Sequence, residues 1–217
     1  MQNPIQNFWN IKFEEMKKTL EHNNYEVFLA DTIEQAKDIV LNQIFPKTDA
    51  QSISWGGSMT LEATGLKDDF KAMDDLQIID TSDSTISTEE KIERRRQALL
   101  VDLFLTGTNA LTEAGHLVNL DMIGNRVGAI TFGPKEVILL IGRNKIVPDL
   151  EAAMDRISNY ASPVNAMRLE RNTPCYKKGM CMDCSSSKRI CNVWTIQEKS
   201  YPKGRIKIVL INEDLGF

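Results

Sequence analysis

The sequence predicts an α/β protein with a largely parallel sheet that is covered by helices on both faces. Along the 217 residues, short apolar runs rich in β-branched residues alternate with amphipathic helical patterns, which is typical of parallel sheets. Three such runs, Val101–Leu105, Val127–Phe132 and Val137–Ile141, lie close together in the centre of the chain. Polar turns separate them, and α/β proteins bind ligands in loops of that kind.

The N-terminal segment contains one helix, one strand and the start of a second helix. Asn3 is the expected N-cap of an amphipathic helix over residues 4–22, because asparagine accepts hydrogen bonds from the first helical turn. Tyr25–Ala30 is predicted as a strand. Asp31 and Glu34 have the spacing of a capping box, so a second helix should follow.

A glycine pair marks the first candidate binding turn. The predicted strand Ser52–Trp55 leads into Gly56, Gly57 and Ser58, and Ser58 is the expected N-cap of the helical sequence MTLEATGL that follows. Glycine lets a ligand approach the backbone, and a helix start offers free N–H groups, so the turn suits an anion. A plain strand-to-helix turn explains the same pattern.

The middle of the chain continues the alternation and then interrupts it. Leu76–Ile79 is predicted as a strand, and Ser87 with Glu90 forms another capping box. Two strands within residues 127–141, joined by Gly133–Pro134–Lys135, indicate a hairpin. The sheet is therefore expected to be mixed rather than wholly parallel.

The C-terminal part contains a helix, a cysteine-rich loop and a last strand. Asp149 is the expected N-cap of the helix, and Arg205–Asn212 is predicted to return to the main sheet. We therefore divide the chain into an α/β domain over residues 1–170, a cysteine loop over 171–195, and a C-terminal strand segment over 196–217.

Composition excludes several classes of protein. The chain is 42% hydrophobic and 26% charged, with a net charge of −4, which favours one globular core and gives no basic surplus for nucleic acid. The Arg94–Arg96 run is interpreted as a solvated helix face. The sequence contains neither a signal-peptide h-region nor an apolar run near the ~20 residues of a membrane span. A cytoplasmic location and no membrane span are expected.

All four cysteines fall in one short stretch: Cys175, Cys181, Cys184 and Cys191. In a reducing compartment, such clustering favours a metal site over disulfides. Four thiolates suit tetrahedral zinc or a 4Fe–4S iron–sulfur cluster. The spacing lacks paired C-x2-C knuckles, which favours the cluster slightly. Disulfides and four independent thiols are the alternatives.

Polar residues around the central strands form the second candidate site. The turn after the first strand consists of Thr106, Gly107, Thr108 and Asn109. Asn125, Arg126 and Lys145 follow, and a carboxylate or phosphate can be held by cations of this kind. Glu113 and His116 are candidates for a catalytic base and acid. In the alternative interpretation Glu113 only bonds its own turn and His116 is partly exposed.

Several segments together resemble the lactate-utilisation (LUD) domain family. They are WGGSMTLEATGL, GTNALTEAGHLVNLDMIGNRVGAITFGPKEVILLIGRNKIV, and the cysteine stretch that begins TPC and ends RIC. The resemblance implies a fold similar to glucosamine-6-phosphate deaminase, ribose-5-phosphate isomerase and CoA transferases. That fold is a three-layer α/β/α sandwich. The family includes components of systems that oxidise lactate to pyruvate with iron–sulfur proteins, and the four-cysteine loop marks a subgroup.

The wider fold also suggests roles for two of the loops. The loop with Glu113, Gly115 and His116 is similar to the catalytic loop of sugar-phosphate deaminases, which has an Asp-Gly-His order. Here Ala114 separates the acid from the glycine, which weakens a deaminase mechanism. The Gly56–Ser58 turn matches the place where related folds hold phosphate or CoA.

Three functional hypotheses follow from the sequence. The first is a component of lactate or organic-acid oxidation, with a small anionic substrate and a metal or iron–sulfur centre. The second is an isomerase, deaminase or CoA-transfer enzyme that uses Glu113 and has only a structural metal. The third is a non-catalytic module that binds a small acid and docks on a partner oxidoreductase. A homodimer is a further candidate assembly.

Overall fold

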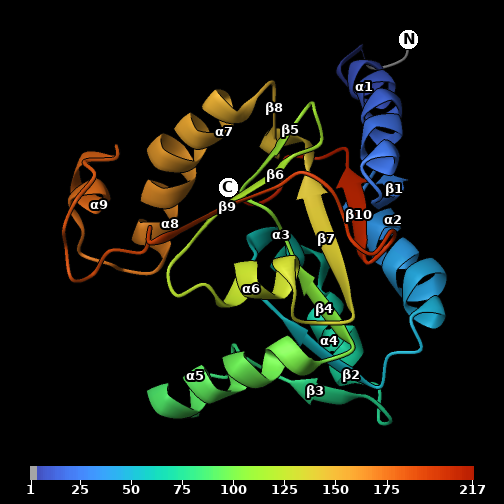
Figure 1. The fold of residues 1–217 in the computed structure, drawn as a ribbon, viewed down its shortest axis with the longest axis horizontal. Coiled ribbons are helices and arrows are strands. Elements are labelled where there is room, and N and C mark those ends of the chain that lie inside the picture. The colour runs from blue at the N-terminus through green and yellow to red at the C-terminus, as the bar shows by residue number, and fades with distance from the viewer. Residues whose placement is uncertain (1–3) are drawn as a thin grey trace.

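The computed structural model describes residues 4–217 and contains a six-stranded and a four-stranded sheet (Figure 1). The large sheet has the order β1-β10-β7-β4-β2-β3, and all its pairings are parallel. Its strands are β1 (Glu26–Ala30), β2 (Ser52–Trp55), β3 (Gln77–Ile79), β4 (Leu103–Thr106), β7 (Glu136–Gly142) and β10 (Ile206–Ile211). The expected N-cap Asn3 lies outside the described residues.

Helices cover both faces of the large sheet. On one face lie α1 (Pro4–His22) and α6 (Asn125–Thr131), and on the other α2 (Ile33–Asp38), α3 (Met59–Thr64) and α4 (Leu66–Lys71). Helix α7 (Leu150–Arg156) packs on the four-stranded sheet, and the remaining helices are α5 (Thr88–Gln97), α8 (Ser162–Arg168) and α9 (Pro174–Lys178). None of them is long and apolar enough to cross a membrane.

Alternating residues of the central strands fill two separate cores. Val137 and Leu139 of β7 pack with α1 and α6 on one face, whereas Ile138 and Leu140 pack with α2, α3 and α4 on the other. Successive side chains of a strand point to opposite faces, so an apolar run of this kind must be covered twice. The expected three-layer α/β/α sandwich is confirmed.

The predicted strand Val127–Phe132 is wrong, because these residues belong mainly to helix α6. Gly124 precedes the helix with φ 87°, a left-handed conformation that favours glycine. Asp121 then accepts a hydrogen bond from the backbone N–H of Arg126 at 3.2 Å and so caps the first turn. The hairpin at Gly133–Pro134–Lys135 is therefore also wrong, and this segment joins α6 to β7.

The antiparallel pairings occur in the second sheet, which the sequence did not predict. Its order is β8-β5-β6-β9, formed by β5 (Ala110–Thr112), β6 (Leu117–Asp121), β8 (Ile146–Val147) and β9 (Val193–Gln197). Strand β6 pairs antiparallel with both β5 and β9. These strands are only two to five residues long, so each gives too short an apolar pattern to be recognised. Strand β9 also connects the end of the cysteine loop to the body of the protein.

Three of the expected helix caps are present and one is displaced. Ser58, Ser87 and Asp149 each accept a hydrogen bond from the backbone N–H three residues later. The predicted cap at Asp31 is wrong, because the N-cap of α2 is Thr32. Asp31 instead donates its backbone N–H to the side chain of Gln35 at 2.7 Å.

Candidate anion-binding site

A cavity of about 390 Å³ lies at the carboxyl ends of the large sheet. The loops after β2, β3, β4 and β7 all contribute to it, together with α5, α6 and α8. Open α/β sheets bind ligands in this position. The residues of the predicted binding set that line the cavity are Gly57, Ser58, Gly107, Thr108, Asn109, Asn125, Arg126 and Lys145.

The remaining two predicted binding residues, Gly56 and Thr106, lie beside the cavity without lining it. A methyl group placed on Gly56 would come within 2.8 Å of the Thr106 hydroxyl and 3.0 Å of the Arg126 side chain. A methyl group on Gly107 would come within 2.6 Å of the Ser58 hydroxyl. The two glycine turns therefore meet, and glycine is needed at both positions because the chains approach so closely.

Arg126 is a buried clamp that connects the loops around the cavity. Its guanidinium group donates to the carbonyls of Gly107 and Leu120 and to the side-chain oxygens of Asn109 and Asn119. Burial lowers its pKa, and the Asp121 carboxylate, 3.7 Å away, opposes that shift. Because the protein already uses most of its donors, Arg126 contributes positive charge more than free hydrogen bonds.

Lys145 is the most deeply buried cation without a partner in the cavity. It lies in the 3-10 turn after β7 and is 4% exposed. Within residues 4–217 its amino group has neither a hydrogen bond nor an ion pair. Burial, followed by the positive charges of Arg156 and Arg126, lowers the pKa of Lys145 to about 7. A buried ammonium group without a partner is costly, so the site gains from an anion.

The cavity as a whole has a surplus of positive charge. Its cationic lining residues are Lys67, Arg95, Arg126, Lys145, Arg168 and Arg171, and its acidic ones are Glu62 and Asp121. Lys67 pairs with Glu62, whereas the side chains of Arg95 and Arg171, like that of Lys145, have no partner among the described residues. In a chain of net charge −4, such a concentration of cations focuses a positive field in the cavity.

Four of these cations, Lys67, Arg95, Arg168 and Arg171, were missed by sequence reasoning. Arg95 belongs to the run interpreted as a solvated helix face. Arg94 and Arg96 pair with Glu90 and Glu93 along the helix, and Arg94 also pairs with Asp83 in the loop after β3. Arg95 instead lines the cavity. Arg168 and Arg171 lie at and after the end of α8. Nothing in the local pattern distinguishes them from surface arginines, because only the packing of α5 and α8 brings them to the strand ends.

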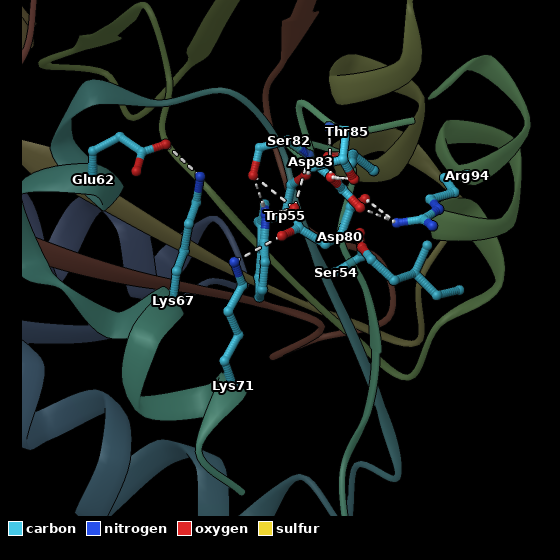
Figure 2. Close-up of polar contacts among 12 residues, drawn as sticks. Ser54, Trp55, Glu62, Lys67, Lys71, Asp80, Ser82, Asp83, Thr85 and Arg94 are labelled. Atoms are coloured by element: carbon cyan, nitrogen blue, oxygen red, sulfur yellow. Dashed lines mark hydrogen bonds and ion pairs between the residues drawn. The ribbon is translucent and has the colours of Figure 1, made fainter. Parts of the chain in front are cut away.

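A polar network around Trp55 holds one wall of the cavity in place. The indole N–H of Trp55 donates to Asp80 and Ser82, and the ammonium groups of Lys67 and Lys71 each lie 5.5 Å from its ring (Figure 2). Thr81, which with Ser82 lines the cavity, donates to the backbone carbonyl of Trp55. The loop after β3 is thereby fixed to the end of β2.

Asp80 should stabilise this wall in a pH-dependent way. Burial opposes its ionisation, but hydrogen bonds from Lys71 and Ser82 outweigh burial and lower the pKa of Asp80 to about 2. A carboxyl group whose pKa falls on folding stabilises the protein above its ordinary pKa and ceases to do so as the pH falls through about 2.

We expect Asp80→Asn to lower the free energy of unfolding at pH 7 by about 1–2 kcal/mol, since charged hydrogen bonds are lost. The variant should also lose less stability than the wild type between pH 4 and pH 2. Urea unfolding at both ends of this range measures the effect. Asp75→Asn, at an exposed position, is the control and should change neither the stability at pH 7 nor its loss between pH 4 and pH 2. If Asp80→Asn and the wild type lose equal stability over that range, the stabilising role of the Asp80 carboxylate is contradicted.

The structure does not bring Glu113 and His116 into the cavity. Both lie at the turn between β5 and β6, next to α1. The Glu113 carboxylate forms an ion pair with Lys12 of α1. The Nδ1 atom of His116 is buried and has no hydrogen-bond partner among the described residues. Their catalytic role stays a prediction, without support from the geometry of the cavity.

The four cysteines lie in and after α9, which projects at one side of the molecule (Figure 1). All four thiols are free, and Arg189 folds the loop by donating to the carbonyls of Cys184 and Cys191 at 2.6 and 2.7 Å. Burial raises the pKa of Cys191, and the nearby Cys175 and Cys181 add to the shift. The donor set suits zinc or an iron–sulfur cluster, although within residues 4–217 no group of three ligands is already positioned to hold a metal.

The fold and the site together define an open-sheet α/β protein whose cavity lies at the carboxyl ends of the strands. More specifically, the chain belongs to the LUD domain family, because that family's model matches residues 13–211. It is therefore a lactate-utilisation-type protein.

The fold is also found in a solved structure. The chain is similar to a DUF162 family protein from Deinococcus radiodurans, with a TM-score of 0.51 and 11% sequence identity, over 93% of this chain and 97% of the other. At this identity the likeness supports the fold alone. A comparison with curated proteins gave no match.

Proposed function

We propose that the protein binds a small organic acid in the cavity, as a component of lactate or related organic-acid oxidation. The observation that carries the proposal is that three cations of one cavity, Arg95, Lys145 and Arg171, have no side-chain partner within residues 4–217. Its volume of about 390 Å³ lies at the small end of the range for ligand pockets. Membership of the LUD domain family supports lactate utilisation as the biological context.

Titration calorimetry with small carboxylates tests this proposal. Oxalate, lactate and pyruvate should bind, whereas lactamide, which has the same size as lactate and no charge, should not. Salt should weaken binding, since exposed charges are screened. Preference for a sugar phosphate or an acyl-CoA over every carboxylate would contradict the proposal and would favour the isomerase or CoA-transfer alternative. That alternative lacks structural support, because its acid Glu113 does not line the cavity.

We propose, as a second role, that the four cysteines hold a 4Fe–4S cluster or a zinc ion. Cys175, Cys181, Cys184 and Cys191 would be the ligands. A cluster would supply one-electron transfer, whereas zinc would only fix the loop. The cysteine loop also contains the exposed side chains of Tyr176, Met180 and Met182. Such adaptable apolar groups suit docking of a partner oxidoreductase.

Elemental analysis with a visible spectrum, on protein prepared without oxygen, tests the cysteine site. We expect a cluster to give brown protein that contains iron, and a structural site to give colourless protein that contains zinc. Cys184→Ser should lower the bound metal strongly, because one ligand is lost. Ser187→Ala, three residues away in the same loop, is the control and should retain it. Wild-type protein that contains neither iron nor zinc after this preparation would contradict the proposal.

A further inference from the structure

We propose that the Nζ atom of Lys145 forms an imine with the carbonyl carbon of a small 2-oxo acid held in the cavity. The inference rests on the proposed function and deepens it, since it names both the class of ligand and the atom that reacts. It concerns covalent chemistry and not only charge attraction.

The position of Lys145 is that of a nucleophile rather than of a structural cation. The side chain is nearly inaccessible to bulk solvent, yet it lines the cavity and makes no polar contact within residues 4–217. Gly216 packs close to it, because a methyl group on that glycine would come within 3.4 Å of Nζ. By contrast, the buried Lys207 pairs with both Glu26 and Glu136. Among the described lysines, only Lys145 thus combines deep burial and a place in the cavity lining with an amino group that has no partner.

The neighbours of Lys145 favour its uncharged, nucleophilic form. Arg156 lies near it and donates to the carbonyls of Asn144 and Asn109 at 3.1 and 2.8 Å. Those carbonyls satisfy its hydrogen bonds without cancelling its charge. Arg126 is a second positively charged neighbour that lowers the pKa of Lys145. Lysine is activated as a nucleophile by desolvation or by a neighbouring cation, and both conditions are met here.

The same cavity provides groups that can hold the carboxylate of a 2-oxo acid. Arg95 and Arg171 line it, and their side chains have no partner in the described part of the chain. A guanidinium group binds a carboxylate through two parallel hydrogen bonds. A 2-oxo acid carries its carbonyl carbon directly beside its carboxylate. A cationic cavity with one free amine is therefore complementary to this class of molecule.

The reaction is balanced without an oxidant or a reductant. The lone pair of the uncharged Nζ forms a bond to the carbonyl carbon, and the carbonyl oxygen takes up a proton from the nitrogen. The oxygen then leaves as water after a second protonation, and a carbon–nitrogen double bond remains. The net change is amine plus carbonyl to imine plus water.

Trapping with cyanoborohydride tests the inference. Wild-type protein is incubated with pyruvate or glyoxylate at pH 7, reduced, digested, and mapped by mass spectrometry. We expect one reduced adduct, on Lys145, and protection from it by oxalate. Because the pKa of Lys145 is about 7, its uncharged fraction at pH 7 is about a thousandfold larger than that of an ordinary lysine, so it should react ahead of the surface lysines.

Two variants complete the test. Lys145→Arg should lose the adduct, and Lys199→Arg, at an exposed lysine, should keep it. An oxalate-binding wild type that gives no adduct, or only scattered adducts on surface lysines, would overturn the imine and leave the proposed function intact. Absence of both oxalate binding and the adduct would overturn both. The wild-type arm decides the matter even when Lys145→Arg fails to fold.

Discussion

Replacement of Arg126 by alanine is expected to lower the free energy of unfolding by about 3–5 kcal/mol, the range found when one member of a buried ionic network is removed. Arg126 is 7% exposed and joins the loop after β4 to strand β6. Without it, the carbonyl of Gly107 loses its donor and the Asp121 carboxylate keeps a negative charge with no cation beside it. Buried polar groups left in this way are costly.

Urea unfolding measures the effect, and Arg168→Ala is the matched control. Arg168 is an arginine of the same cavity, but it is exposed, donates to Asn165 of its own helix and lies 6.0 Å from the centre of the Phe217 ring. Its removal should change stability by less than about 1 kcal/mol. Similar losses in the two variants would show that the Arg126 network does not hold the loops together.

Replacement of Lys145 by methionine should have the opposite effect on stability. Methionine has nearly the shape of the lysine stem and no charge, so the ligand-free protein should gain on the order of 1–4 kcal/mol, as when buried ionic groups are replaced by apolar ones. The same variant should bind oxalate about 10–100-fold more weakly, because a charged hydrogen bond is lost. Higher stability together with weaker binding is expected when a binding site destabilises the free protein.

The pH dependence gives a second measurement on Lys145→Met. In the wild type the unfolded lysine has its ordinary pKa of 10.5, whereas burial lowers the folded value to about 7. Between these values the unfolded state binds more protons, so wild-type stability should rise with pH from 7 to 10. The variant should lack this part of the rise. Oxalate binding to the wild type should weaken over the same range, because the ammonium group loses its proton.

Lys199→Met is the control for both measurements, since Lys199 is exposed and outside the cavity. It should bind oxalate as the wild type does. Tight oxalate binding by Lys145→Met would show that Arg95 and Arg171 suffice for the anion.

The strand-end loops could be identified from the sequence, and the helix contribution to the cavity could not. Gly57, Ser58 and Gly107 follow directly after apolar runs, and parallel strands bring such turns to one edge of a sheet. Arg95 reaches the same edge only because α5 packs in one particular orientation. No local pattern encodes that orientation, so a run of charges on a polar helix indicates a solvated face from the sequence alone.

The errors in the central stretch have a related cause. Val127–Phe132 has the composition of a strand, but the Asp121 cap and the burial of the Arg126 side chain fix it as a helix. Short apolar runs are ambiguous between the two states, and tertiary contacts decide. Glu113 and His116 were selected for their chemistry alone. Their turn lies beside α1 rather than beside the cavity. The second sheet fixes this position, and the sequence does not predict that sheet.

The position of β10 has a consequence for how the protein is made. This strand is the last of the large sheet in chain order, yet it lies between β1 and β7 and contributes to both cores. A nascent polypeptide that has left the ribosome only as far as β9 therefore exposes two unpaired strand edges and two unfinished apolar surfaces. Such intermediates are prone to self-association. Native packing of the large sheet must wait until β10 has been synthesised, and chaperones that shield exposed edges should be of most use to this protein before that point.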